Sequence, residues 1–213
     1  MDCCVPTQPI SSYFDACKAG REAAQYLKVG LAPHAKAMLA AVSRGGVGDA
    51  SVLEVGGGVG GLQFELLRRG AAHATNVEVS VDYLTAAQTL ARQLGLADRL
   101  SFRHGDFARE ADSIPAADIV VMHRVVCCYP DMASLVSAAA HHARRRLALS
   151  FPRDAWPVRL FIEAQALWMR MKGSSFRTYV HSPEAIFRVA AESGLKPVHQ
   201  VYSGPWQIVV FEP

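Results

Sequence analysis

Acidic residues and a glycine-rich loop follow the first buried, strand-like segment of the sequence. The stretch "VLEVGGGVGG" (52–61) places Glu54 two residues before the first of five glycines, and two further acids follow in "NVEVS" (Glu78) and "HGDF" (Asp106). Such a loop lets the backbone approach a ligand closely, and the ligand is often a phosphate. A carboxylate at this place repels a phosphate and attracts a cation. The three acids therefore predict a ligand with a positive centre, hydroxyl groups and an exocyclic amine.

S-adenosylmethionine is a ligand of this kind, because it carries a sulfonium and an ammonium, presents a ribose and an adenine, and has no phosphate. We expect Glu78 to accept hydrogen bonds from the ribose hydroxyls and Asp106 to accept one from the adenine amine. Phe107 would offer an apolar face to the adenine ring. A dinucleotide remains the alternative, since the glycine loop also satisfies the GxGxxG spacing, with an acid further along the chain.

Alternating strand-like and helical segments would position these acids at neighbouring strand ends. The β-α-β alternation is typical of a mostly parallel sheet with helices on both faces. The last two strand-like segments, joined by Gly204 and Pro205, predict antiparallel neighbours. Before the first strand, residues 11–43 are expected to be helical, capped by Ser11 or Ser12 and restarted by Pro33. The expected strands are 51–56, 74–80, 99–106, 117–124, 146–152, 195–203 and 205–212, and the expected later helices are 61–70, 82–95, 131–144 and 183–193.

Composition argues against several classes of function. The 213 residues are 51% hydrophobic, enough for the core of one domain, and a net charge of +3 is too mild to predict nucleic-acid binding. The basic run 144–146 is interpreted as a solvated helix end. No apolar stretch approaches the ~18 residues of a membrane span, and the first residues predict no signal or transit peptide. The cysteine pattern predicts no disulfide framework, no metal site and a cytoplasmic protein; the cysteines are Cys3, Cys4, Cys17, Cys127 and Cys128.

The motifs "LEVGGGVGGL", "NVEVS", "HGDF" and "VVMHRVVCCYPD" together resemble the cofactor-binding core of class I S-adenosylmethionine-dependent methyltransferases. The resemblance implies a single α/β domain over residues 1–213, with a doubly wound, seven-stranded Rossmann-like sheet that is mostly parallel and has an antiparallel last strand. It also places Glu54 near the amino group of the cofactor and His123 where the backbone of the family faces the donor methyl. The expected cofactor-binding residues are Tyr13, Glu54, Gly56, Gly57, Gly58, Gly60, Glu78, Val79, Asp106, Phe107 and His123.

The flanking segments are similar to magnesium-protoporphyrin O-methyltransferases, in "CCYPD" and in the layout of the segment that ends in "HSPEAIFRVAAESGL". Enzymes of that type esterify a propionate on a large, flat, apolar substrate. The chain departs from their pattern at Arg124 and Cys128, where that family tends to have an acid and a histidine. We therefore expect an apolar, anionic small molecule as the methyl acceptor, methylated at oxygen, with a carboxylate as the candidate group.

Three residues after the fourth strand are candidates to face the donor methyl: His123, Cys128 and Tyr129. Methyl transfer is an in-line displacement, so the protein mainly has to align the acceptor and exclude water. A carboxylate acceptor needs no general base, whereas a phenol, an amine or a thiol would benefit from one. An N-terminal helical cap (1–46), which carries Tyr13 and Tyr26, and a lid insertion (152–181) are expected to close over the site.

Several alternatives stay open at this point. The apolar side chains of 152–181 are interspersed with arginines, so this segment is interpreted as a lid, as a helix packed on the sheet or as an amphipathic helix on a membrane surface. The paired cysteines leave open methylation of sulfur or of a soft metalloid. A non-catalytic S-adenosylmethionine-binding or membrane-associated protein is the alternative outside enzymes.

Overall fold

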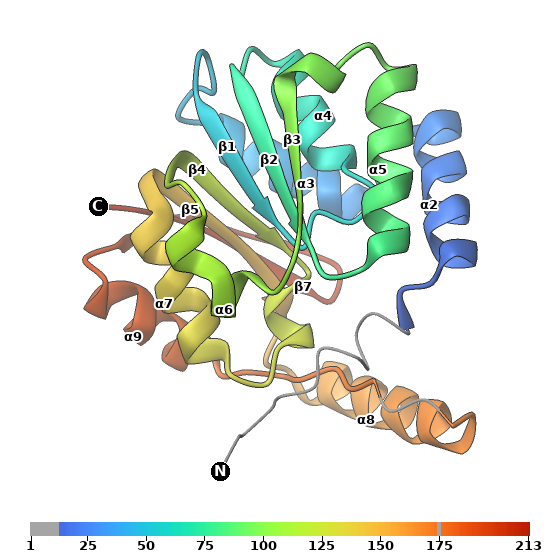
Figure 1. Ribbon diagram of the computed structural model, residues 1–213. Helices are drawn as coiled ribbons and strands as arrows, with labels where there is room; N and C mark the ends of the chain where they lie inside the picture. The colour runs from blue at the N-terminus through green and yellow to red at the C-terminus, as the bar shows by residue number, and fades with distance from the viewer. Residues whose placement is uncertain (1–12, 174–175) are drawn as a thin grey trace.

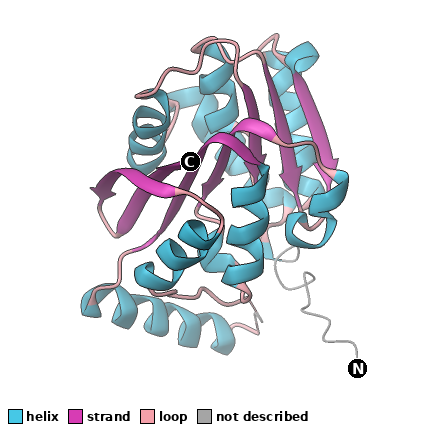
Figure 2. Ribbon diagram, turned by 90° about the vertical axis from the view of Figure 1, so that its left-hand side faces the viewer, coloured by secondary structure: helices cyan, strands magenta, loops and turns pink. Residues whose placement is uncertain are grey.

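The computed structural model describes residues 13–173 and 176–213. Its centre is one seven-stranded sheet with the order β3-β2-β1-β4-β5-β7-β6 (Figures 1 and 2). The first five strands pair in parallel, and β7 runs antiparallel to both β5 and β6. The strands are β1 (Ser51–Val55), β2 (His73–Glu78), β3 (Leu100–His104), β4 (Ala117–His123), β5 (Ala143–Pro152), β6 (Lys196–Ser203) and β7 (Trp206–Glu212).

Helices cover both faces of the sheet (Figure 2). Helices α3, α4 and α5 share one apolar cluster, while α6, α7 and α9 contribute to a second cluster. Helix α2 packs against α5. The helices are α2 (Ala16–Val29), α3 (Pro33–Ser43), α4 (Gly61–Arg68), α5 (Val81–Gln93), α6 (Phe107–Glu110), α7 (Met132–His142), α8 (Trp156–Met171) and α9 (Pro183–Glu192), with short 3₁₀ turns η1 (Ala97–Arg99), η2 (Ala111–Ser113) and η3 (Val126–Cys128).

The fold class predicted from the sequence is confirmed, including the antiparallel pair at the end of the chain. Pro33 does begin α3. The proposed caps Ser11 and Ser12 lie outside the described residues, and the N-cap of α2 is Asp15. Helix α5 begins before the predicted residue 82, because Ser80 is its N-cap and accepts a hydrogen bond from the N–H of Tyr83. Local capping chemistry, rather than hydrophobic spacing, therefore sets these two boundaries.

The interpretation of residues 144–146 as a helix end is wrong. Helix α7 ends at His142, and these residues belong to β5. Arg146 is only 4% exposed. Its guanidinium donates to the carbonyl oxygens of Val42, at 2.7 Å, and Gly45, and its Nε lies 3.2 Å from Oε1 of Glu212. The side chain thus joins the end of α3 to β5 and β7.

Residues 152–181 contain one helix, α8, which lies at the edge of the molecule, apart from the sheet (Figure 1). None of the described helices has the length and apolar character that crossing a membrane requires. In residues 13–173 and 176–213, no group of three or more His, Cys, Asp or Glu side chains is arranged to hold a metal ion.

We predict that Arg146→Ala lowers the free energy of unfolding by about 3 kcal/mol, because two backbone carbonyls and the Glu212 carboxylate lose a buried cationic donor. Arg145→Ala, on the neighbouring and exposed residue of the same strand, is the matched control and should change stability little. Urea unfolding of both variants measures the difference. Equal midpoints for the two variants would contradict the structural role of Arg146.

Candidate active site

A cavity of about 790 Å³ opens at the carboxyl ends of β1, β2 and β4. Residues from the N-terminal segment, α2 and α3 cover one side, and residues of α8 border another. The lining includes all but one of the residues predicted for the site: Tyr13, Glu54, Gly56, Gly57, Gly58, Glu78, Val79, Asp106, Phe107, His123, Cys128 and Tyr129. The exception is Gly60.

The glycine loop after β1 is held by contacts that leave no room for side chains. Gly56 has a φ of +61°, and its N–H donates to the carbonyl oxygen of Val77 at 2.7 Å. A Cβ on Gly56 would lie 2.6 Å from Cγ2 of Val125. The sequence predicts cofactor contact for Gly60 as well, but this residue does not line the cavity. A Cβ there would lie 2.9 Å from Cζ of Phe64, so Gly60 instead permits the close start of α4.

Glu54, the last residue but one of β1, is almost completely buried (3% exposed). Its Oε2 accepts a hydrogen bond from the N–H of Gln63 at 3.2 Å. Burial, opposed by this hydrogen bond and reinforced by the charge of Glu78, raises the pKa of Glu54 to about 8. The carboxyl is therefore protonated at neutral pH in the free protein. A cation bound beside it would favour the ionised form.

Glu78, at the end of β2, is held in place by two backbone donors. Its Oε2 accepts from the N–H of Gly58 at 3.0 Å, and its Oε1 accepts from the N–H of Ser80 at 2.9 Å. Burial raises the pKa of Glu78, while these hydrogen bonds act in the opposite direction. Each carboxylate oxygen has acceptor capacity beyond one hydrogen bond. The side chain can therefore bind ligand hydroxyls without releasing the glycine loop.

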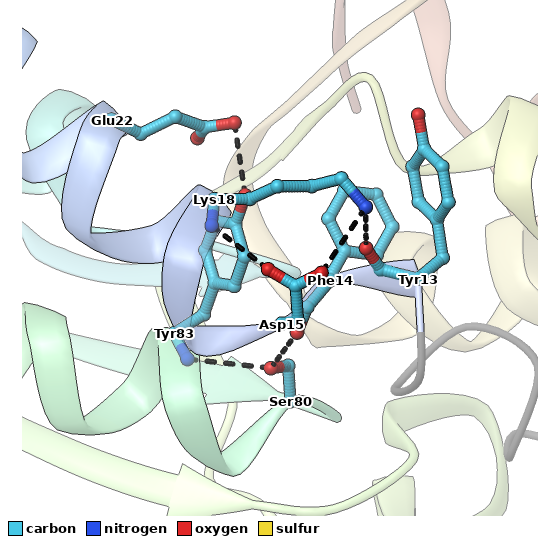
Figure 3. A network of polar contacts seen from close by, with 7 residues as sticks. All are labelled: Tyr13, Phe14, Asp15, Lys18, Glu22, Ser80 and Tyr83. Carbon is cyan, nitrogen blue, oxygen red and sulfur yellow. Dashed lines mark hydrogen bonds and ion pairs between the residues drawn. The ribbon is translucent and has the colours of Figure 1, made fainter.

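A polar network ties the segment before α2 to the end of β2 (Figure 3). Ser80 Oγ donates to the carbonyl oxygen of Phe14 at 2.6 Å and accepts from the N–H of Tyr83 at 3.3 Å. Lys18 Nζ donates to the carbonyl oxygen of Tyr13 and lies 3.8 Å from the centroid of the Tyr13 ring. This network holds the segment at the cavity. It reaches Glu78 through Ser80, whose N–H donates to the Glu78 carboxylate.

Aromatic residues extend this cover. Tyr13 stacks on Phe176, with ring centroids 4.3 Å apart and planes within 5°, so the N-terminal segment meets the segment after α8. Tyr26 also lines the cavity. Its hydroxyl donates to Oε1 of Glu65 at 2.8 Å and accepts from Arg68 at 3.1 Å. The hydroxyl of Tyr26 is thus used by the fold, whereas its ring borders the cavity.

Asp106 combines its predicted place at the cavity with a role as the N-cap of α6. Its Oδ1 accepts from the N–H of Ala108 at 3.1 Å. Its Oδ2 accepts from the hydroxyl of Tyr129 at 3.3 Å and lies 3.5 Å from Nε of Arg109. Tyr129 therefore orients Asp106, and Phe107 lies buried directly after it in the chain. A ligand amine bound here would donate to a carboxylate that already accepts the N-cap hydrogen bond of α6.

His123, at the end of β4, is held as a neutral ring. Burial, with the nearby His34 and Arg124, lowers the pKa of His123 to about 3. Its Nδ1 lies 2.9 Å from Oγ of Ser150, which already accepts from the N–H of Arg124 at 2.9 Å. Ser150 is completely buried and has no other acceptor within the described residues, so its hydroxyl must donate to Nδ1. The proton of the ring is then on Nε2, which has no hydrogen-bond partner within the described residues.

Arg124 follows β4 with a φ of +63°, a costly conformation for a residue with a Cβ. Its carbonyl oxygen accepts from the thiols of Cys127 and Cys128, both at 3.5 Å, and its N–H is bound by Ser150. The guanidinium lines the cavity 5.0 Å from the ring of Trp206. Within the described residues, no carboxylate forms an ion pair with it. The strained turn thus places a cation without an acidic partner on the cavity wall.

Sequence analysis missed several cavity residues. His34 of α3 stacks on His123 with ring centroids 5.1 Å apart, and Trp206 begins β7. Glu22 of α2 accepts from the hydroxyl of Tyr83 at 2.9 Å. These residues come from the two ends of the chain and follow no spacing rule. Only the three-dimensional fold brings them to the strand ends.

We predict opposite effects of Glu54→Gln on stability and on binding. A carboxyl whose pKa is raised in the folded state above its unfolded value of 4.5 destabilises the fold increasingly as pH rises from about 4.5 to about 8. The variant should therefore be more stable than the native chain at about pH 8 but not at about pH 4. It should also bind S-adenosylhomocysteine, which carries an ammonium, roughly tenfold more weakly, because the charge partner is lost.

Urea unfolding at the two pH values and calorimetry with S-adenosylhomocysteine measure these effects. Glu192→Gln, on an exposed residue at the end of α9, is the control. An unchanged affinity in Glu54→Gln would rule out the proposed contact between Glu54 and the ligand ammonium.

Comparison with known proteins finds one domain family and several similar solved structures. Residues 52–147, from β1 into β5, match the methyltransferase domain family. Magnesium protoporphyrin IX methyltransferase from Synechocystis PCC 6803 with bound SAH has a similar structure, with a TM-score of 0.75 at 19% identity over 97% of this chain and 99% of that one. Its complex with SAM gives 0.72 at 19% identity, over 100% and 99%.

An O-methyltransferase family 2 protein from Planctomyces limnophilus, in complex with apigenin, has a TM-score of 0.65 at 22% identity, over 99% of this chain and 63% of that one. No curated protein sequence matches the chain significantly. The domain match and the ligands of the two Synechocystis structures agree with the cofactor expected from the acids at the strand ends. Residues 52–147 therefore match a methyltransferase domain, and the chain shares the fold of the two Synechocystis structures.

Proposed function

We propose that the protein transfers the methyl group of S-adenosylmethionine to a carboxylate oxygen of a small, largely apolar acceptor. The observation that carries the proposal is Arg124, an exposed cation on the cavity wall that has no acidic partner within the described residues. A guanidinium held in this way suits a carboxylate better than a neutral group. The remaining walls near α8 are mostly apolar, with Val158, Phe161, Ile162 and Gln165.

The strand-end residues fit the cofactor. The buried Glu54 lacks a cation partner, and Glu78 has acceptor capacity for hydroxyl groups beside the glycine loop. Gly56 can carry no side chain without meeting Val125. We assign Glu54 to the ammonium, Glu78 to the ribose, and Asp106 with Phe107 to the adenine. Bound there, S-adenosylmethionine supplies an electrophilic methyl group on a sulfonium leaving group.

The chain contributes alignment and exclusion of water rather than proton transfer. A carboxylate is already ionised at neutral pH, so its reaction needs no general base. His123 is a neutral ring whose Nε2 is buried, so it borders the acceptor space without transferring a proton, and Arg124 can neutralise the carboxylate. The stacked pair of Tyr13 and Phe176 closes the cavity from the side of the N-terminal segment and keeps water away.

The structural neighbours support an acceptor with an extended apolar body. One is named for magnesium protoporphyrin IX, and another was solved with apigenin. The present cavity, at about 790 Å³, must hold both the cofactor and the reacting part of the acceptor. An acceptor of this size would project toward α8, where the apolar wall continues.

We predict that carboxylic acids are methylated in preference to their matched primary amides or methyl esters, and that Arg124→Gln abolishes most of this preference. The expected loss in kcat/KM is roughly 10- to 100-fold for acids and small for any neutral acceptor, because one charge-assisted contact is lost. Release of S-adenosylhomocysteine is the readout over a panel of aromatic and aliphatic acids.

Arg153→Gln is the matched control, since Arg153 also lies over an aromatic ring, that of Tyr202 at 4.5 Å, but does not line the cavity. The activity of Arg153→Gln should stay close to that of the native chain. Preference for neutral acceptors over acids in the native protein would overturn the carboxylate proposal.

Sulfur or metalloid methylation through a thiol relay makes a different prediction. The hydrogen bond from Cys127 and burial raise the pKa of Cys128 well above its usual value, so Cys128 is a neutral thiol that supports the Arg124 turn. Cys128→Ser keeps a donor for the Arg124 carbonyl and should retain activity within about threefold. Loss of methyl transfer to thiols or arsenite in this variant alone would favour the relay.

A further inference from the structure

Helix α8 carries an apolar face that nothing in the described chain covers. Among residues 13–173 and 176–213, eleven large hydrophobic side chains are strongly exposed, and six of them belong to this one helix. Scattered exposed hydrophobic residues are normal in proteins, but such a concentration marks an interaction surface. The six side chains, all more than half exposed, are Trp156 (77%), Leu160 (59%), Phe161 (67%), Leu167 (59%), Trp168 (52%) and Met171 (72%); we call them the outer stripe.

The spacing shows that the outer stripe is one continuous face. At 3.6 residues per turn, positions 156, 160, 164, 167, 168 and 171 fall on one side of the helix, with 161 at its border. The opposite side, formed by Val158, Ile162, Gln165 and Met169, is buried or half-buried. The helix therefore has two apolar faces. The inner face packs against the protein, and the outer face points away from the core.

Cations border the outer stripe on both sides. Arg159 and Arg170 lie on one border, and Lys172 on the other, with its Nζ 4.0 Å from the centroid of the Trp168 ring. Neither Arg170 nor Lys172 forms an ion pair within the described residues. Glu163 is the single acid of α8. An apolar face with tryptophans and flanking cations is the pattern of helices that lie in a membrane interface.

We infer that α8 docks the protein on the surface of a membrane that contains anionic lipid, with the outer stripe in the headgroup and upper acyl region. Charge decides between this occupant and a second copy of the chain. Arg159 is paired with Asp154. Two copies facing each other through the stripe would therefore bring four cations without an ion pair in the described residues, Arg170 and Lys172 of each copy, against two glutamates, whereas anionic headgroups would neutralise these cations. The inference goes beyond the proposed function and does not depend on which atom is methylated.

Docking in this way would also place the cavity beside the membrane. Val158, Ile162 and Gln165, on the inner side of α8, line the cavity, and Phe161 borders both surfaces. Figure 1 shows α8 at the edge of the molecule, away from the strands. Among the described residues nothing buries the outer stripe, so this side of the helix can meet a planar surface. An acceptor with an apolar body could then enter the cavity past α8 without crossing bulk water.

The test is flotation of the full chain with phosphatidylcholine vesicles, prepared with and without phosphatidylglycerol. We expect binding to the anionic vesicles, weakened at least tenfold by high salt or by omission of the anionic lipid, because each basic residue near the surface contributes roughly fivefold. Leu160→Glu/Leu167→Glu should reduce binding by tenfold or more. Leu27→Glu/Val198→Glu, at two residues equally exposed elsewhere (54% each), should bind within twofold of the native chain.

Circular dichroism and S-adenosylhomocysteine affinity, which should be unchanged in both double variants, establish that they are folded. A blue shift of tryptophan fluorescence on addition of anionic vesicles should accompany binding in the native chain. The inference is overturned if the native chain does not float with anionic vesicles, or if Leu160→Glu/Leu167→Glu floats as well as the control. It is also overturned, in favour of a second copy of the chain as the occupant, if the native chain forms a dimer that Leu160→Glu/Leu167→Glu abolishes and binds no vesicles.

Discussion

Two carboxyl groups withdrawn from water at the ends of β1 and β2 constrain the rest of this site. Glu54 and Glu78 are 3% and 7% exposed, and burial raises the pKa of both. Protonation or hydrogen bonding must offset the cost of burying them while no cation is present. The fold supplies donors from the glycine loop and from α4, through the N–H groups of Gly58 and Gln63. In the proposed function, a cationic ligand bound beside Glu54 would offset part of this cost.

Glu78 also connects the end of β2 to the N-terminal segment. Glu78 accepts from the N–H of Ser80, and Ser80 donates in turn to the carbonyl oxygen of Phe14. Tyr13, the residue before Phe14, stacks on Phe176 beyond α8. A short series of contacts therefore runs from the strand-end acid to the cover of the cavity. Occupation of the position beside Glu78 and closure by this segment act on shared contacts, so each should favour the other.

The strand-end residues of the cavity could be located from the sequence, whereas the cavity residues that the fold brings together from distant segments could not. Acids and glycines at successive strand ends converge because parallel strands finish at one edge, so local spacing located Glu54 and Glu78. His34 and Trp206 carry no such signal, since the fold brings them together from α3 and β7. The Arg146 error has a similar origin. Its partners Val42 and Glu212 lie far away in the sequence, and a buried arginine within a basic run resembles a solvated helix end.

The cavity wall carries charges of opposite sign, and this arrangement limits how an acceptor can bind. Glu78 and Asp106 would repel an anion, while Arg124 would attract it. Arg124 is held there by a strained turn that depends on Ser150 and the paired cysteines. Strain of about 1–3 kcal/mol persists only where surrounding contacts determine it. In the proposed function, the turn therefore serves acceptor selection, and the glycine loop serves cofactor binding.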